Sequence, residues 1–160
     1  MLCNLDDPRN VGAAWRLGEI MGAERLLLIG RTPQPPNRKL QRLARGAEKR
    51  LPYSSFASLE DCLRAAYDEE PRPFVLGVEL ASDALALPAA VAKWRGGTER
   101  SLLLLVGNEA QGLSPQELGL CDTVAFIPQY GQVSSLNVTS ALSMVLWECL
   151  REHSIRSDHS

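Results

Sequence analysis

Apolar residues fall along the chain in two patterns, short unbroken runs and longer stripes with a spacing of three or four. The runs are strand-sized and occupy residues 25–29, 74–78, 101–106 and 123–127, whereas residues 1–3 can form only the end of another strand. The stripes between the runs predict helices. Strands that alternate with helices predict an α/β fold, with a mostly parallel sheet covered by helices on both faces. The run at 101–106 is the most apolar, so we expect it near the centre of the sheet.

The first predicted helix follows a loop of turn-forming residues at 4–10. Asn10 stands where an N-cap belongs. Arg16 points about 140° away from Val11 around the helix, so it lies off the apolar stripe. It is therefore either an ordinary surface arginine or a side chain directed into a neighbouring cleft. The stripe itself consists of Val11, Ala14, Trp15, Gly18 and Gly22.

The last predicted helix runs from Val138 to Leu150, with Asn137 as its N-cap. Its apolar stripe consists of Val138, Ala141, Leu142, Val145 and Cys149. Further apolar residues lie around much of the remaining circumference, namely Met144, Leu146, Trp147 and Leu150. A helix of this kind is central in a large core or shared with another chain. Because 160 residues do not make a large core, we expect a two-fold interface with a second copy.

The length fits one domain, which we place at residues 1–151, followed by a frayed tail at residues 152–160. Hydrophobic residues make up 45% and charged residues 22% of the chain, as in soluble globular proteins. The sequence has no membrane-spanning run and no signal pattern, which predicts a cytoplasmic protein without membrane contact. The four cysteines share no metal-like spacing, and both histidines are near the C-terminus. We therefore expect free thiols and no metal site.

The net charge is −2, from 17 basic and 19 acidic residues, which argues against a generally basic nucleic-acid binder. Residues 38–50 nevertheless contain six basic residues and a single glutamate. If the segment were helical, one face would carry Arg38, Arg42, Arg45 and Lys49, although Gly46 weakens a continuous helix. The segment is either a solvated charged face or a patch that neutralises RNA phosphates.

Several common chemistries lack their signatures in this sequence. There is no G-x-G-x-x-G motif and no P-loop, and no serine or histidine stands in a triad-like arrangement. What remains is a set of loops that follow strands, at residues 4–10, 76–77, 107–112 and 128–137. In an open α/β sheet, ligands collect at the carboxyl ends of the strands. Backbone groups of glycine-containing loops can hold an adenine edge and a ribose there.

Three of these loops resemble the motifs of the SpoU/TrmH branch of the SPOUT methyltransferases. The first motif is matched by Asn4-Leu5-Asp6-Asp7-Pro8-Arg9-Asn10-Val11-Gly12-Ala13-Ala14, followed by Arg16. The second motif is matched by Leu105-Val106-Gly107-Asn108-Glu109-Ala110-Gln111-Gly112-Leu113. The third comprises Ile127-Pro128, Gly131 and Ser135-Leu136-Asn137-Val138. The motifs occur in order and span essentially the whole chain. Gln129 departs from the methionine that is common in the family, and Thr139-Ser140 from its serine-valine pair.

The resemblance implies S-adenosylmethionine as cofactor, methyl transfer to a ribose 2′-hydroxyl of tRNA or rRNA, a deep C-terminal trefoil knot and a homodimer. Pattern reasoning alone would not predict a knot. By motif position, the catalytic residues are expected to be Asn10, Arg16, Glu109, Ser135 and Asn137. The cofactor-binding residues are expected to be Leu76, Gly77, Gly107, Asn108, Ile127, Ser135 and Leu136. The RNA-binding residues are expected to be Arg9, Arg38, Lys39, Arg42 and Arg45.

Arginine is effectively always protonated in proteins, so Arg16 is a poor candidate for a base. We expect it to clamp a phosphate and the developing alkoxide, and the proton acceptor stays open. Glu109 could orient Arg16 or accept a proton. Two alternatives remain, an RNA base methyltransferase of the same superfamily and a non-catalytic RNA-binding protein with this fold.

Overall fold

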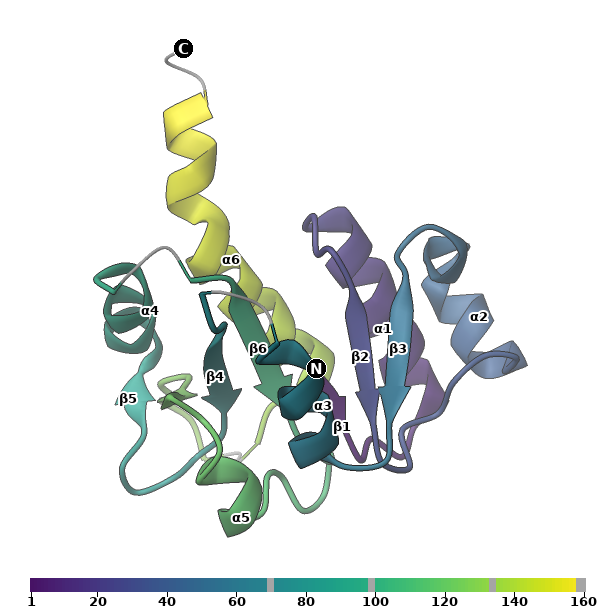
Figure 1. Cartoon of the computed structure of the whole chain (residues 1–160), viewed down its shortest axis with the longest axis horizontal. Helices are drawn as coiled ribbons and strands as arrows, with labels where there is room; N and C mark the ends of the chain where they lie inside the picture. Colours follow the sequence, from purple (N-terminus) through teal and green to yellow (C-terminus); the bar gives the residue numbers. More distant parts are fainter. Residues whose placement is uncertain (69–70, 98–99, 133–134, 158–160) are drawn as a thin grey trace.

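The structure is a computed structural model that describes residues 1–68, 71–97, 100–132 and 135–157 (Figure 1). Seven strands in this described part form one sheet in the order β3-β2-β1-β6-β4-β7-β5, and every neighbouring pair is parallel. The strands are β1 (Leu2–Cys3), β2 (Leu26–Ile29), β3 (Tyr53–Phe56), β4 (Phe74–Val78), β5 (Leu85–Ala86), β6 (Leu102–Val106) and β7 (Thr123–Phe126). The parallel α/β fold is confirmed, and the most apolar strand lies at its centre.

Helices cover both faces of this sheet (Figure 1). Leu2, Leu28 and Val106 share a core with residues of α1, α2 and α6, whereas Cys3, Ile29 and Leu105 share one with α3. A third cluster joins β4 and β7 to α4 and α6. The helices are α1 (Pro8–Ile20), α2 (Arg38–Ala44), the 3₁₀ helix η1 (Ala47–Lys49), α3 (Leu59–Ala66), α4 (Leu87–Arg95), α5 (Pro115–Leu118) and α6 (Val138–Ser157).

The first two helices cross at unusually close range. Trp15 of α1 is fully buried, and its indole nitrogen donates to the Leu51 carbonyl at 3.1 Å. Gly12 lies against the backbone of α2, because a Cβ atom at this position would be 2.2 Å from the Leu40 carbonyl oxygen. The contact fixes the basic helix α2 beside the start of α1.

The start of α1 differs from the prediction. Asp7, not Asn10, is the N-cap, and its carboxylate accepts from the Arg9 backbone N–H at 2.8 Å. Pro8 occupies the first helical position, where its missing N–H costs no hydrogen bond. Asn10 is therefore inside the first turn, and its side chain is available for a contact with another loop. The helix ends at Ile20, so Gly22 lies beyond it.

Two short strands, β3 and β5, have no counterpart in the predicted elements. Each forms an edge of the sheet and pairs on one side only. The alternating exposed and half-buried residues of β3 carry two serines, and β5 has only two residues. An edge strand has less surface to bury than a central strand, so it leaves a weaker apolar pattern.

The final helix begins as predicted and ends later. The Asn137 carboxamide oxygen accepts from the Thr139 backbone N–H at 2.9 Å, which confirms the N-cap. The stripe is also confirmed, since Val138, Leu142, Val145 and Cys149 are buried and Ala141 is half-buried. The helix continues to Ser157, so the tail expected from residue 152 is helical over its first six residues. Its last turns project past the sheet (Figure 1).

The four cysteines are free thiols, and Cys3, Cys62 and Cys149 are buried. Burial raises the pKa of Cys62, Cys121 and Cys149 to about 11, so these thiols are protonated and unreactive near neutral pH. Within the described ranges, no helix is long and apolar enough to cross a membrane.

Candidate active site

The strand order places a reversal near the middle of the sheet. From β1 the chain proceeds outwards to β2 and β3, and it then returns to β4, which lies beyond β6 on the other side. At such a reversal the loops after neighbouring strands run in opposite directions and leave a crevice at the carboxyl edge. The three sequence motifs are the loops that follow β1, β6 and β7, so the fold brings all of them to this edge.

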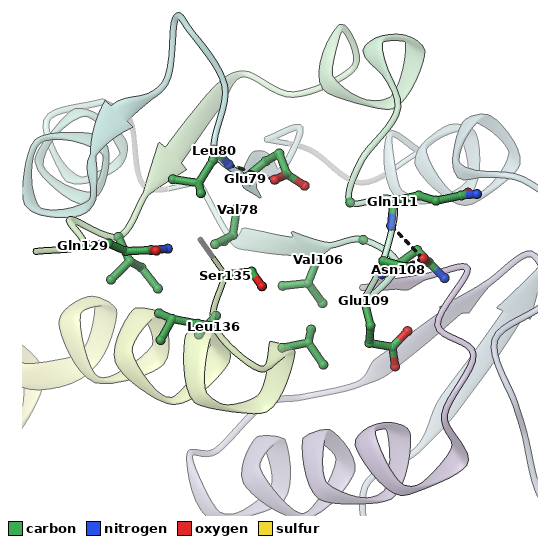
Figure 2. A pocket seen from close by; sticks show the side chains of 16 residues that line it. Val78, Glu79, Leu80, Val106, Asn108, Glu109, Gln111, Gln129, Ser135 and Leu136 are labelled. Atoms are coloured by element: carbon green, nitrogen blue, oxygen red, sulfur yellow. Dashed lines mark hydrogen bonds between the residues drawn. The ribbon is translucent and has the colours of Figure 1, made fainter. Parts of the chain in front are cut away.

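A cavity of about 250 Å³ lies there, between β4, β6 and the start of α6 (Figure 2). Glu79 and Leu80 form one side of it, and Ser135 and Leu136 lie on the side of α6 (Figure 2). The full lining is Val78, Glu79, Leu80, Val106, Gly107, Asn108, Glu109, Ala110, Gln111, Gly112, Ile127, Gln129, Ser135, Leu136, Val138 and Ala141.

The loop after β6 is closed on itself by backbone contacts. Asn108 and Gly112 exchange two backbone hydrogen bonds, of 3.2 and 2.9 Å. A Cβ atom at Gly107 would lie 2.5 Å from the carbonyl of Gly112, and Gly112 has a φ of +66°. Both positions therefore favour glycine, one for space and one for its backbone conformation. The resulting narrow loop is a wall of the cavity.

The side chain of Asn108 fastens this loop to the loop after β1. Its amide nitrogen donates to the Asn4 carbonyl and to the Asp6 carboxylate, each at 2.8 Å. Its oxygen accepts from the backbone N–H groups of Ala110 and Gln111 (Figure 2). Asn108 is 6% exposed, and its side-chain groups are engaged in holding the loops together.

A second set of side chains connects all three motifs. The Asn10 amide donates to the Glu109 carboxylate at 2.8 Å. The Asn137 amide in turn donates to the Asn10 oxygen at 3.3 Å. Glu109 also accepts from the Asp6 backbone N–H at 3.0 Å. The first turn of α1, the loop after β6 and the start of α6 thus meet in one hydrogen-bonded cluster next to the cavity.

This cluster decides the ionisation of Glu109. Partial burial by itself would raise the pKa of the carboxyl group, but the hydrogen bonds from Asn10 and from the backbone of Asp6 and Asp7 outweigh it, so the pKa lies below its ordinary value. Glu109 is therefore ionised near neutral pH. A carboxylate held in this way is a weak base and a firm hydrogen-bond acceptor, which suits it to fixing Asn10.

Arg16 stands apart from the cluster. It lies six residues beyond Asn10 on α1, which is about 9 Å further along the helix axis. Its side chain is exposed and makes no hydrogen bond or ion pair with the described residues. Ile20 follows one turn later on the same face of α1 and is 62% exposed. Within a single chain, Arg16 is therefore a surface arginine and is not directed into a neighbouring cleft.

The predicted cofactor residues divide into two groups. Gly107, Asn108, Ile127, Ser135 and Leu136 line the cavity, as does Glu109. Leu76 and Gly77 do not line it: both are buried in β4, and a Cβ at Gly77 would lie 2.8 Å from the Cys121 sulfur. The cavity is reached one residue later, at Val78.

The sequence reasoning missed Val78, Glu79 and Leu80 as lining residues. Their signal is positional, since they end or follow a buried strand at the carboxyl edge of the sheet. Gln111, Gly112 and Gln129 also line the cavity and fall within the quoted motifs or next to them.

The predicted RNA-binding residues are all exposed, namely Arg9, Arg38, Lys39, Arg42 and Arg45. Arg9 forms an ion pair of 2.7 Å with Asp7 at the start of α1. The other four belong to α2 and its C-cap, so the continuous stripe to Lys49 is interrupted at Arg45, which adopts a left-handed conformation. The close crossing of α1 and α2 keeps this basic surface beside the first motif.

The fold and the cavity define a class of protein, an α/β protein with a cavity at the carboxyl edge of a parallel sheet, walled in part by a glycine-containing loop. In the described part of the chain, no three His, Cys, Asp or Glu side chains gather as they would around a metal ion.

The chain belongs to the SpoU rRNA methylase family, whose sequence pattern matches residues 1–147. It is 28% identical to the 23S rRNA (guanosine-2′-O-)-methyltransferase RlmB of Ralstonia nicotianae, over 97% of this chain and 59% of that protein. It is 34% identical to an uncharacterized tRNA/rRNA methyltransferase of Mycobacterium tuberculosis, over 94% of this chain and 44% of that protein. The chain thus spans about half the length of these relatives.

Solved structures agree with this assignment. The SpoU methyltransferase AviRb of Streptomyces viridochromogenes, in complex with AdoMet, matches with a TM-score of 0.80 and 26% identity, over 96% of this chain and 56% of that one. A protein studied for "2-OH methylation of C/U34 on tRNA" matches with a TM-score of 0.80 and 25% identity, over 97% and 95% of the two chains. The match to SpoU structures gives the chain the knotted SPOUT fold.

Proposed function

We propose that this protein transfers a methyl group from S-adenosylmethionine to a ribose 2′-hydroxyl of rRNA or tRNA. The observation that carries the proposal is the cluster of Asn10, Glu109 and Asn137, which joins all three family motifs at the rim of one cavity. The relatives support it, since they include a 23S rRNA 2′-O-methyltransferase and a structure studied for ribose methylation of tRNA. We place the activity in the cytoplasm, where such RNAs are found.

The cavity fits the proposed cofactor. Its walls are the backbone of a narrow glycine loop, apolar side chains such as Val78 and Ile127, and two carboxylates. The apolar side chains suit an adenine ring, and the carboxylates suit the positive charge of a sulfonium. When bound, S-adenosylmethionine supplies an electrophilic methyl group, and the sulfur keeps the electron pair of the broken bond.

The protein's own contribution is positioning. A ribose hydroxyl is a poor nucleophile, and holding it in line with the methyl group removes much of the barrier. Asn10 and Asn137 have amide groups that could bind the ribose beside the cavity, and Glu109 fixes Asn10 in place. The low pKa of Glu109 argues against a role as the main proton acceptor.

We further propose that the working form is a homodimer. Ile20 on α1 and Met144 and Trp147 on α6 are 62%, 46% and 61% exposed in the single chain, on helices that pack against each other. Covering such side chains is favourable by about 25 cal/mol for each Å² of apolar surface. Arg16 shares its helix face with Ile20, so a second copy on this face would place Arg16 at the boundary between two chains. An RNA bound across the dimer would meet it there.

The test of the proposal compares Arg16→Ala with wild type in single-turnover methyl transfer to total rRNA and tRNA. We expect a loss of roughly 100-fold or more, because a charge-assisted contact made mainly in the transition state is removed. Binding of S-adenosylhomocysteine and resistance to urea should stay unchanged. Arg64→Ala is the matched control, since Arg64 is an exposed arginine on α3, across the sheet.

Mapping the product decides between the candidate activities. Methylation at a ribose 2′-oxygen makes the adjoining phosphodiester resistant to alkali, whereas methylation of a base does not. Alkali-sensitive product would support the alternative of a base methyltransferase. Failure of the wild-type protein to bind S-adenosylmethionine at millimolar concentration would contradict enzyme activity altogether.

A further inference from the structure

Glu79 joins two walls of the cavity. It follows β4 directly, and its carboxylate accepts the backbone N–H of Leu80 on its own strand end and the backbone N–H of Leu113 at the end of the loop after β6. Both hydrogen bonds are 2.9 Å long. Figure 2 shows the side chain between these two segments, on the side of the cavity opposite Ser135 and Leu136.

The loop after β6 is shaped to receive this carboxylate. A Cβ atom at Gly112 would lie 2.1 Å from the nearer Glu79 carboxylate oxygen, so only a glycine leaves the carboxylate room to reach Leu113. The glycine loop and the carboxylate therefore form one unit. Glu79 is half-buried in this unit, which protects its charge partly from solvent.

The charged side chains that line the cavity have one sign. Among the described residues of the lining, the ionisable ones are Glu79 and Glu109, and none is a lysine or arginine. Glu109 is directed toward Asn10 and the backbone of Asp6, on the side of α1. Glu79 is on the far side and accepts two backbone N–H groups, whereas Glu109 accepts three N–H groups, and neither forms an ion pair within the described residues. Its charge is therefore the less compensated of the two.

A negative cavity treats the proposed cofactor and its by-product differently. S-adenosylmethionine carries a sulfonium and has a net charge of about +1 at neutral pH, from the ordinary pKa values of its amino and carboxyl groups. S-adenosylhomocysteine is a thioether, so it has lost that positive charge and is otherwise the same shape apart from one methyl group. A fixed carboxylate attracts the first by a Coulomb term that the second lacks.

We infer that Glu79 is a specificity-determining residue that favours the sulfonium cofactor over its thioether product. The inference rests on the proposed function. In this role Glu79 raises the affinity of the fresh cofactor relative to the spent one, which favours replacement of the product by S-adenosylmethionine after each methyl transfer. Its hydrogen bonds to Leu80 and Leu113 keep the charge at a fixed place beside the ligand.

The test uses Glu79→Gln and measures the Kd of each ligand by calorimetry. Glutamine is nearly isosteric and keeps one acceptor oxygen, but it has no charge. We expect the ratio of the Kd for S-adenosylhomocysteine to the Kd for S-adenosylmethionine to fall by roughly fivefold to tenfold in this variant. The change is modest because the Glu79 carboxylate is partly exposed and its Coulomb interaction is therefore screened. Most of the shift should come from weaker binding of S-adenosylmethionine.

Glu117→Gln is the matched control. Glu117 also accepts a loop N–H, that of Ser114 at 2.7 Å, and it too is a half-buried carboxylate near the loop after β6. It lines a neighbouring cavity with Asn4 and Arg31, not the cavity described above. Any loosening of the loops in this variant should therefore change the two Kd values by the same factor.

The outcomes separate the inference from the function on which it rests. Equal losses for both ligands in Glu79→Gln would show that Glu79 only holds the loop, which overturns the inference and leaves the proposed function intact. Wild-type protein that binds neither ligand overturns both. If Glu79→Gln does not fold, the wild-type protein can be tested at different salt concentrations, because salt screens a partly exposed charge. The ratio of its Kd values for S-adenosylhomocysteine and S-adenosylmethionine should fall in about 1 M salt. A ratio that stays constant contradicts the inference.

Discussion

The crossing of α1 and α2 offers a sharp test of the structure, through the variant Gly12→Ala. In a helix, alanine is favoured over glycine by about 1 kcal/mol, so propensity alone predicts a more stable protein. The new Cβ, however, would lie 2.2 Å from the Leu40 carbonyl oxygen, 3.0 Å from its carbonyl carbon and 3.1 Å from the Ala44 nitrogen. All three are backbone atoms, which cannot rotate away. The helices must separate by about 1 Å, because an ordinary carbon–oxygen contact is longer than 3 Å.

Overpacking of a close contact costs about 1–3 kcal/mol, and here the contact is with rigid backbone, so the upper part of this range applies. The clash therefore outweighs the propensity gain, and we expect Gly12→Ala to lose about 2 kcal/mol of unfolding free energy. Gly18→Ala is the control on the same helix. Its Cβ would meet only side-chain atoms, 3.3 Å from a Leu51 methyl and 3.6 Å from the Ala23 Cβ. It should be neutral or more stable by up to about 1 kcal/mol.

Urea denaturation followed by circular dichroism, at equal protein concentrations, measures the difference. With a slope of about 2 kcal/mol/M for a chain of this size, the midpoints of the two variants should differ by more than about 1 M. Because α2 carries the basic surface, Gly12→Ala should also weaken RNA binding and leave S-adenosylhomocysteine binding intact. Superimposable denaturation curves for the two variants would refute the close helix crossing.

Two further predictions concern partners. Arg42→Glu combined with Arg45→Glu should weaken RNA binding without an effect on cofactor binding. The slope of the logarithm of the RNA-binding constant against the logarithm of the salt concentration should fall by roughly one unit for each RNA phosphate that the protein no longer neutralises. An unchanged slope would mean that α2 is only a solvated face. Trp147→Glu should lower the dimer content seen by light scattering at micromolar concentration, because it places a charge where the second copy would exclude water. Leu85→Glu, at an exposed edge strand, is its control, and a wild-type protein that is monomeric and active would contradict the dimer.

The sequence determined those features that depend on local pattern. Buried central strands are continuous apolar runs, so β2, β4, β6 and β7 were identifiable, whereas the edge strands β3 and β5 were not, because they bury less surface. The N-cap at Asn137 is a local hydrogen bond to the Thr139 backbone, two positions along the chain, and it is confirmed. The same local reasoning misplaced the start of α1, since Asp7 and Asn10 are both good caps and the proline at position 8 favours the earlier one.

Tertiary structure alone decided how distant residues combine. The Asn10 amide could not be assigned to Glu109 from the sequence, because 99 positions separate them and only the parallel sheet brings their loops to one edge. Glu79 belongs to no motif, and its role depends on the space left by Gly112 across the cavity. Motif position suggested Leu76 and Gly77 as cofactor-binding residues, but both are buried inside β4 because the sheet is covered on both faces, and the cavity opens only from Val78 onward. A sequence supplies the groups available for chemistry, and the register and packing of the strands determine which of them reach the same place.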